Sequence, residues 1–152
     1  MVNLLNKKNH HLEFQNASAA IIVNNENKYL VQLRDNVEKI FYPNHWGLFG
    51  GASEKNEDPL TTVSREILEE ISIKINDFKY FTNIKFDLDF IKQGQIERTY
   101  YTAEISIEEE NIIQLNEGKE YKFISQEELL SLTNLVPYDA YVLWLYFNYL
   151  SR

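Results

Sequence analysis

The stretch "GLFGGASEKNEDPLTTVSREILEEISI", residues Gly47 to Ile73, decides how the rest of the chain is interpreted. It holds paired glycines, an isolated glutamate, and then Glu66, Glu69 and Glu70 on a segment that predicts a short helix. Side chains three and four residues apart are neighbours on one helical face, and like charges placed there repel by roughly 0.2–0.5 kcal/mol per pair. Water and salt absorb this repulsion, or a cation binds to the cluster.

A helix is predicted over Asp58–Ile71. Pro59 suits the first helical turn, where the N–H that proline lacks has no partner within the helix. An apolar stripe with helical spacing is formed by Leu60, Val63, Ile67 and Ile71. The three glutamates lie to one side of this stripe, at the edge of the surface that the helix buries.

The segments on either side of this helix predict a mixed architecture. Strands are predicted over 17–23, 28–34, 78–90, 95–105 and 121–125, and a closing helix over 136–150. Strands interleaved with helices favour an α/β (α+β) sandwich. A length of 152 residues suits one domain around a single core. The aromatic residue Trp46 and the aromatic side chains of the closing helix are expected mainly in that core.

The composition excludes several classes of protein. A net charge of -8 argues against a long nucleic acid as partner, although a bound divalent cation can reverse the sign locally. The chain has no cysteine, so disulfides, thiolate metal sites and cysteine nucleophiles are excluded. The first residues lack the apolar segment of a signal peptide, and no apolar run reaches the ~18 residues of a membrane helix. We therefore expect a cytoplasmic protein that does not bind membranes.

The spacing of the opening stretch resembles a known motif. From Gly51, five residues lead to Glu57, and seven more lead to the run Arg65-Glu66-Ile67-Leu68-Glu69-Glu70. This resembles the Nudix box, G-x5-E-x7-R-E-U-x-E-E-x-G-U, in which U is an aliphatic residue. The final glycine of the motif is Ser72 here. Either Ser72 adopts a left-handed backbone, which costs a non-glycine residue roughly 1–2 kcal/mol, or the helix ends in a different way. A lone "REILEE" equally suits a solvated helix face, but the complete spacing favours the Nudix box.

The resemblance implies a single Nudix hydrolase domain over residues 1–152, with an α/β/α sandwich around a mixed sheet. It also implies a hydrolase that cleaves a pyrophosphate bond in a nucleoside diphosphate linked to another group. Such a reaction needs Mg²⁺ or Mn²⁺, because a polyanionic diphosphate repels a nucleophile until a cation offsets its charge and polarises water. Hard cations of this kind prefer oxygen ligands.

The resemblance carries roles over to individual residues. The metal ligands it implies are the backbone carbonyl of Gly50 and the carboxylates of Glu66, Glu69, Glu70 and, from a loop before the last strand, Glu117. Glu120 is the second choice for that loop acid. Glu66 either ligates the metal or orients the attacking water as general base, and Glu117 is the alternative base.

Two further residues of the motif are expected to brace it. Arg65 is predicted to pair with Glu57 and so to hold the glycine loop against the helix. Arg65, Glu57 and Glu66 form the predicted catalytic set.

Substrate recognition is predicted from residues outside the motif. Arg34, which closes the second strand, is expected to meet a phosphate, and a surface ion pair is its alternative. Tyr138 is expected to offer a stacking face. Asp139 either accepts hydrogen bonds from a base or stabilises the start of the last helix. Nucleoside triphosphates and nucleotide sugars both stay open as substrates, since the proline typical of ADP-ribose hydrolases is missing and the isomerase branch of the fold needs a cysteine.

A second function is also open. A Nudix-fold module can bind a nucleotide for regulation without cleaving it, although such modules usually lose carboxylates of the box, and this chain keeps them all. The expected partner in either case is a small nucleotide. The sequence leaves open a homodimer.

Overall fold

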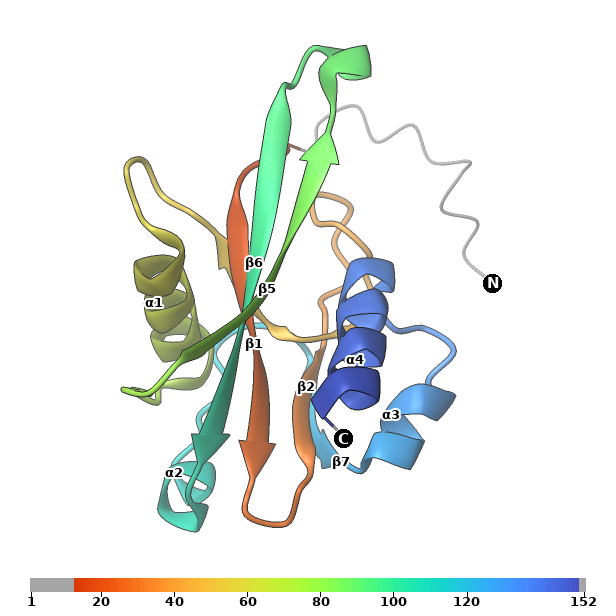
Figure 1. The fold of residues 1–152 in the computed structure, drawn as a ribbon. Helices are drawn as coiled ribbons and strands as arrows, with labels where there is room; N and C mark the ends of the chain where they lie inside the picture. Colours follow the sequence, from red (N-terminus) through yellow and green to blue (C-terminus); the bar gives the residue numbers. More distant parts are fainter. Residues whose placement is uncertain (1–12, 151–152) are drawn as a thin grey trace.

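The computed structural model describes residues 13–150 (Figure 1). The elements follow in the order β1 (Ala17–Asn24), β2 (Tyr29–Leu33), β3 (Trp46–Gly47), β4 (Phe49–Ala52), α1 (Pro59–Ile71), β5 (Lys79–Asp87), the 3₁₀ helix η2 (Asp89–Ile91), β6 (Gln95–Ile105), α2 (Ile107–Asn111), β7 (Glu120–Ile124), α3 (Gln126–Ser131) and α4 (Pro137–Leu150). No helix in this part of the chain is long and apolar enough to cross a membrane.

Within the described residues, seven strands form one sheet in the order β3-β2-β1-β6-β5, with β4 paired to β1 and β7 paired to β2. Strand β1 runs parallel to β6 and antiparallel to β2 and β4. Strands β5 and β6 form a long antiparallel hairpin that extends past the other strands (Figure 1). The predicted mixed sheet is therefore confirmed.

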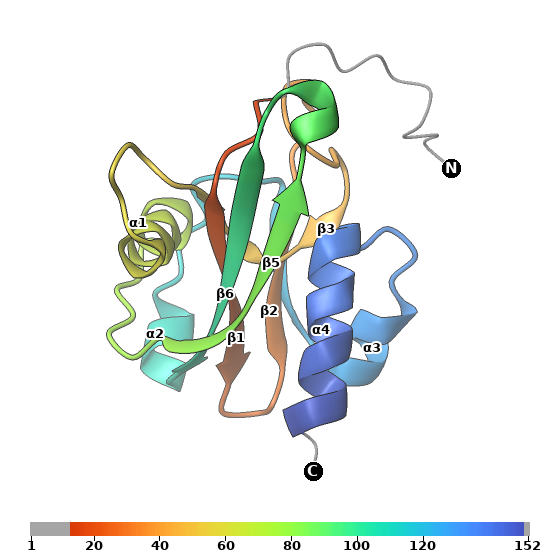
Figure 2. The same ribbon diagram turned by 45° about the horizontal axis from the view of Figure 1, so that its top comes forward.

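Helices cover both faces of the sheet, with α1 on one side and α4 on the other (Figure 2). Alternate residues of β1 serve the two layers, because successive side chains of a strand point to opposite faces. Ala20 and Ile22 pack into the core under α1, whereas Ala19 and Ile21 pack into the core under α4. The α/β/α sandwich expected from the sequence is the observed architecture.

Helix α1 begins and ends as its sequence predicts, with one correction. Asp58 caps its start by accepting hydrogen bonds from the N–H groups of Leu60 and Thr61, and Ser72 ends it in the left-handed conformation with φ 62°. Leu60 was predicted in the buried stripe, but 46% of it is exposed. In this turn the buried side chain is Thr62, whose hydroxyl donates to the carboxylate of Glu57.

The sequence did not predict several short elements, namely β3, β4, α2, α3 and η2. Trp46 lies in the core under α4, as expected. The aromatic residues of α4 divide: Phe147 is buried, whereas Tyr141 and Trp144 are exposed and stack on each other with centroids 6.3 Å apart.

Candidate active site

The paired glycines Gly50 and Gly51, predicted in a loop, lie on strand β4, and the segment that carries them is called the glycine loop below. They allow α1 and β1 to approach β4 closely. Gly50 has φ 135°, and a Cβ at this position would lie 2.2 Å from the backbone oxygen of Ser18. A Cβ on Gly51 would lie 2.3 Å from a carboxylate oxygen of Glu66. Any larger residue would therefore displace β1 or push Glu66 away from the strand.

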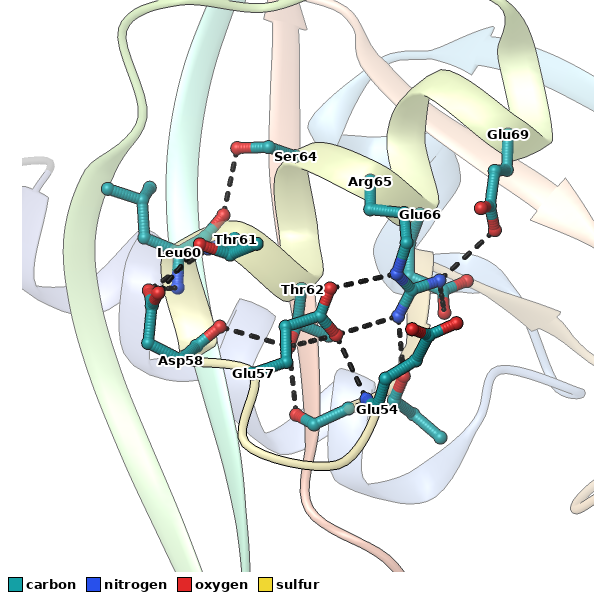
Figure 3. A network of polar contacts seen from close by, with 12 residues as sticks. Glu54, Glu57, Asp58, Leu60, Thr61, Thr62, Ser64, Arg65, Glu66 and Glu69 are labelled. Carbon is teal, nitrogen blue, oxygen red and sulfur yellow. Dashed lines mark hydrogen bonds and ion pairs between the residues drawn. The ribbon is translucent and has the colours of Figure 1, made fainter.

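Arg65 braces the start of α1 against the glycine loop (Figure 3). Its Nε and Nη2 donate to the two carboxylate oxygens of Glu57, each at 2.9 Å, and Nη2 also donates to the carbonyl of Ala52 at 2.9 Å. Its Nη1 donates to Glu66 at 2.8 Å and to Glu69 at 3.1 Å. The predicted pair of Arg65 and Glu57 is thus present, and every nitrogen of the guanidinium has a partner. The hydrogen bonds from Arg65 hold the pKa of Glu57 at about 2, well below its ordinary value.

Glu70 is the most buried of the three helical glutamates, with 4% of it exposed. Its Oε2 accepts from the N–H of Gly50 at 2.8 Å, and its Oε1 accepts from Nε2 of Gln32 at 3.2 Å. Burial raises its pKa to about 8, the two hydrogen bonds oppose the rise, and the charges of Glu66 and Glu117 add to it. The sequence predicted that the carbonyl of Gly50 binds a metal. The hydrogen bond that links Gly50 to Glu70 in the structure is donated by the N–H of Gly50.

The other glutamates differ in exposure. Glu66 is mostly buried, and burial raises its pKa while Arg65 lowers it. The side chain of Glu69 is 60% exposed and touches only the edge of the Arg65 network. Glu70 and Glu66 therefore form the inner part of the cluster, and Glu69 the outer part.

The loop that carries Glu117 is tied to the end of α1 through its neighbour Asn116. The backbone N–H of Asn116 donates to the carbonyl of Glu70 at 2.8 Å, and its side-chain Nδ2 donates to the carbonyl of Glu69 and to Oγ of Ser72, each at 2.8 Å. Glu117 is exposed but close enough for its charge to raise the pKa of both Glu66 and Glu70. The structure thus brings the predicted loop acid to the helical glutamates.

The donor set has the chemistry of a site for a hard divalent cation. Neighbouring carboxylates add to the raised pKa of Glu66 and Glu70, and the guanidinium of Arg65 lies as a positive charge between Glu66 and Glu69. Within residues 13–150, no three acidic or histidine side chains are arranged around one point as ligands of a metal ion. The carboxylate oxygens are nevertheless the ligand type that a hard divalent cation prefers. Glu66 and Glu69 form ion pairs with the guanidinium of Arg65.

A cavity of about 1060 Å³ opens beside the glycine loop. Its lining includes Arg34, Tyr42, Gly50, Gly51, Arg98 and Tyr138. A second hollow, lined by Arg65 and Glu66, shares Gln15 and Ala52 with the first. The predicted Arg34 and Tyr138 thus meet in one cavity next to the loop, although Nε of Arg34 is engaged with the carbonyl of Phe41 at 2.9 Å.

Asp139 lies beneath the surface of this cavity and is 2% exposed. Its Oδ2 accepts from the N–H of Leu48 at 3.0 Å, and its Oδ1 accepts from the hydroxyl of Tyr100 at 2.9 Å. Both oxygens therefore already have donors within the protein.

Sequence reasoning did not select Arg98, Gln32 or Asn116. Arg98 and Tyr100 stand two apart on a predicted strand, so their shared face was a usable signal. Gln32 and Asn116 gave no comparable signal, because their partners on α1 lie far away in the sequence.

The family model described as NUDIX domain matches residues 14–145. Among solved structures, the MutT protein from Methanosarcina mazei Go1 is 19% identical with a TM-score of 0.76, covering 93% of this chain and 98% of that chain. The NUDIX domain of Shewanella oneidensis NrtR, complexed with ADP ribose, is 18% identical with a TM-score of 0.70, covering 97% and 96%.

A C. elegans Ap4A hydrolase, solved as a binary complex, is 17% identical with a TM-score of 0.67, covering 91% of this chain and 98% of that one. At these identities the three structures show a shared fold. No curated protein matches the sequence.

Proposed function

The chain belongs to the NUDIX domain family, and we propose that it hydrolyses a pyrophosphate bond in a nucleoside triphosphate or a nucleotide sugar with the help of Mg²⁺ or Mn²⁺. Family membership identifies the chain as a pyrophosphohydrolase, an enzyme that acts on acid anhydrides of phosphorus compounds. One observation carries the finer proposal. Glu66 and Glu70 both contact the glycine loop, and that loop lines a cavity large enough for a nucleotide.

Each carboxylate has a proposed task. The residues that would hold the cation are the carbonyl of Gly50 and the carboxylates of Glu66, Glu69, Glu70 and Glu117. When bound, the cation offsets the charge of the diphosphate and polarises water. Glu66 is also the proposed general base, since burial raises its pKa and so increases its affinity for a proton. Glu117 is the alternative base.

The bracing pair acts on these carboxylates indirectly. Arg65 holds Glu66 through Nη1 and Glu57 through Nε and Nη2, so one guanidinium connects the glycine loop to α1. This arrangement keeps Glu66 against Gly51 and limits its rotation.

The substrate is proposed to lie in the cavity, with Arg34 near a phosphate and Tyr138 against a ring. Asp139 is proposed to support recognition from beneath the cavity surface, because both its oxygens are engaged within the protein. The cytoplasmic location and the homodimer left open by the sequence stay predictions.

A second candidate function is nucleotide binding without cleavage. The observation in its favour is the NUDIX domain of NrtR, whose structure was solved with ADP ribose and covers almost the whole of this chain. Hydrolysis is the better supported function here, because every carboxylate of the box is present and two of them contact the glycine loop.

The test offers a panel of nucleoside triphosphates and nucleotide sugars and measures the products of cleavage, which are pyrophosphate or phosphate from a triphosphate and a nucleoside monophosphate with a sugar phosphate from a nucleotide sugar. We expect cleavage with Mg²⁺ or Mn²⁺, none with EDTA, and a rate lower by several orders of magnitude in the Glu70→Gln variant. Binding without release by the wild-type chain would favour the regulatory module.

A further inference from the structure

A second arginine cluster lies on the opposite side of the sheet from the glutamates. It consists of Arg98 and Tyr100 on β6 and of Tyr138 and Asp139 in the first turn of α4. Tyr100 belongs to the core under α4, and Arg98, two residues before it, points to the same face. The glutamates belong to α1, which covers the other face (Figure 2). If the glutamates bind the diphosphate of a nucleotide, Arg98 therefore contacts another part of the same nucleotide.

Arg98 is held firmly along one edge of its guanidinium. Its Nε donates to the hydroxyl of Tyr100 at 3.0 Å, and that hydroxyl donates onward to Asp139. Its Nη2 lies 3.6 Å from Oδ1 of Asp139, an ion pair without a hydrogen bond. The guanidinium carbon lies 4.8 Å from the centre of the Tyr138 ring. Asp139 and the two tyrosines thus fix both the position and the plane of Arg98.

The remaining donors of Arg98 are available to a ligand. Within residues 13–150, neither Nη1 nor Nη2 donates a hydrogen bond, and the side chain is 12% exposed and lines the cavity. A guanidinium carries five N–H donors and no acceptor, and its fork suits two adjacent acceptors. The wall of the cavity therefore offers hydrogen-bond donors at this point, while the acceptors of Asp139 are used within the protein.

We infer that Arg98 is a specificity-determining residue that binds the edge of a nucleobase carrying two adjacent hydrogen-bond acceptors. This inference rests on the proposed function in one respect, namely that the occupant of the cavity is a nucleotide. Guanine offers such an edge at O6 and N7, the commonest partner of an arginine fork. Cytosine offers one at O2 and N3. Adenine places a donor beside N7, and the two carbonyls of uracil are separated by an N–H, so neither matches the fork.

The experiment measures equilibrium binding, so its result does not depend on hydrolysis. Isothermal titration calorimetry with Mg²⁺ compares GDP, 7-deaza-GDP, CDP, ADP and UDP on the wild-type protein. Replacing N7 by carbon removes one of the two acceptors of guanine and leaves O6, the sugar and the phosphates unchanged. If Arg98 binds guanine, we expect GDP to bind at least about tenfold more tightly than 7-deaza-GDP.

Variants then locate the effect. Arg98→Met should abolish the difference between GDP and 7-deaza-GDP, and Arg98→Lys, which keeps the charge but loses the fork, should reduce it. The matched control is Lys39→Met, which removes another positive charge from the same cavity and should leave the ratio unchanged. The comparison of the two guanine ligands needs no variant, so it stays decisive if Arg98→Met does not fold.

The outcomes distinguish guanine from cytosine as the base that Arg98 binds. Equal binding of GDP and 7-deaza-GDP, together with CDP tighter than ADP and UDP, assigns the edge to cytosine. The inference is overturned if all five ligands bind with equal affinity, or if none of them binds. A base preference that is lost in Arg98→Met, in a wild-type protein that cleaves no nucleotide of the panel, supports Arg98 and refutes hydrolysis.

Discussion

Arg65 and Arg98 stand at opposite faces of the same sheet and differ in how completely they are bonded. Arg65 donates through Nε, Nη1 and Nη2 to Glu57, Glu66, Glu69 and the carbonyl of Ala52. Among the residues that the structure describes, Arg98 donates one hydrogen bond, through Nε, and its guanidinium lies over the ring of Tyr138. The fully bonded arginine has nothing left for a ligand and braces the loop. The arginine bonded along one edge is oriented and still has donors.

This difference separates two tasks that a nucleotide hydrolase must perform. Removing a bond to Arg65 should disturb the loop and the carboxylates that are proposed to act on the diphosphate. Removing a bond to Arg98 should disturb the choice of base. The two sets of effects should be separable, because a sheet layer stands between the clusters.

The largest expected effect is on turnover in Glu70→Gln. This substitution removes a buried charge from the proposed metal site, so kcat should fall by several orders of magnitude. The fold should survive, because an amide can still accept from Gly50 and loses the cost of a buried charge. Steady-state kinetics measures the loss, and Glu108→Gln, at an exposed acid on α2, serves as the control.

The same variant tests whether the clusters are independent. Its order of affinity for the five nucleoside diphosphates should match that of the wild type. A changed order would mean that the glutamates and Arg98 act on the same part of the ligand.

The second prediction ranks the two candidate bases. Glu66→Gln should abolish the rate while substrate still binds, and Glu117→Gln should cost much less, because Glu66 is held against Gly51 and Glu117 is exposed. Single-turnover rates combined with binding measurements give the ranking. The reverse order would move the base to the loop and leave Glu66 as a ligand only.

The third prediction compares the two arginines in stability. Arg65→Met removes both hydrogen bonds that the guanidinium donates to the carboxylate of Glu57, whose side chain is 9% exposed. In Arg98→Met, Asp139 keeps the hydrogen bonds from Leu48 and Tyr100, so Tm should fall by more in Arg65→Met. Thermal unfolding with EDTA measures both. A larger loss from Arg98→Met would show that the cluster under α4 is a brace as well.

The fourth prediction concerns pH. The pKa of Glu57 is about 2 in the folded chain and 4.5 ordinarily, so the unfolded chain binds the extra proton between these values and stability rises with pH there. The pKa of Glu70 is raised to about 8, so the folded chain keeps a proton that the unfolded chain has lost, and stability falls between pH 4.5 and about 8. The melting temperature, measured with EDTA over a series of pH values, should therefore rise between about pH 2 and pH 4.5 and fall between pH 4.5 and about 8.

Glu70→Gln should flatten the falling limb of that profile. Glu66, whose pKa burial also raises, should leave a smaller fall in the same direction. A falling limb as steep as that of the wild type would assign it to other groups.

The smallest expected effect is at Ser72. Ser72→Gly relieves the left-handed backbone, worth roughly 1–2 kcal/mol, but loses the hydroxyl that accepts from Asn116, worth about 1 kcal/mol. Its free energy of unfolding should therefore stay close to that of the wild type. Ser72→Ala keeps the strain and loses the bond, so it should be the less stable variant by about 1–2 kcal/mol in chemical denaturation.

What the sequence by itself determined about this protein lies mostly within one continuous segment. The offsets of Glu57, Arg65 and Glu66 predict the bracing pair, because one helix and its preceding loop set these positions locally. The left-handed end at Ser72 follows from the same local pattern. The order of strands and helices along the chain likewise predicted the sandwich, since each element forms from its own sequence pattern.

Only the tertiary structure decided which distant residues complete the site. Gln32 reaches Glu70 from β2, Asn116 ties its loop to the end of α1, and Arg98 meets Asp139 from a different element. Asp139 shows the limit most clearly: the sequence left open whether it binds a base or stabilises the start of α4, and in the fold its oxygens accept from the N–H of Leu48 and the hydroxyl of Tyr100. Pairings between strands and helices depend on register and packing over the whole chain, which no local spacing records.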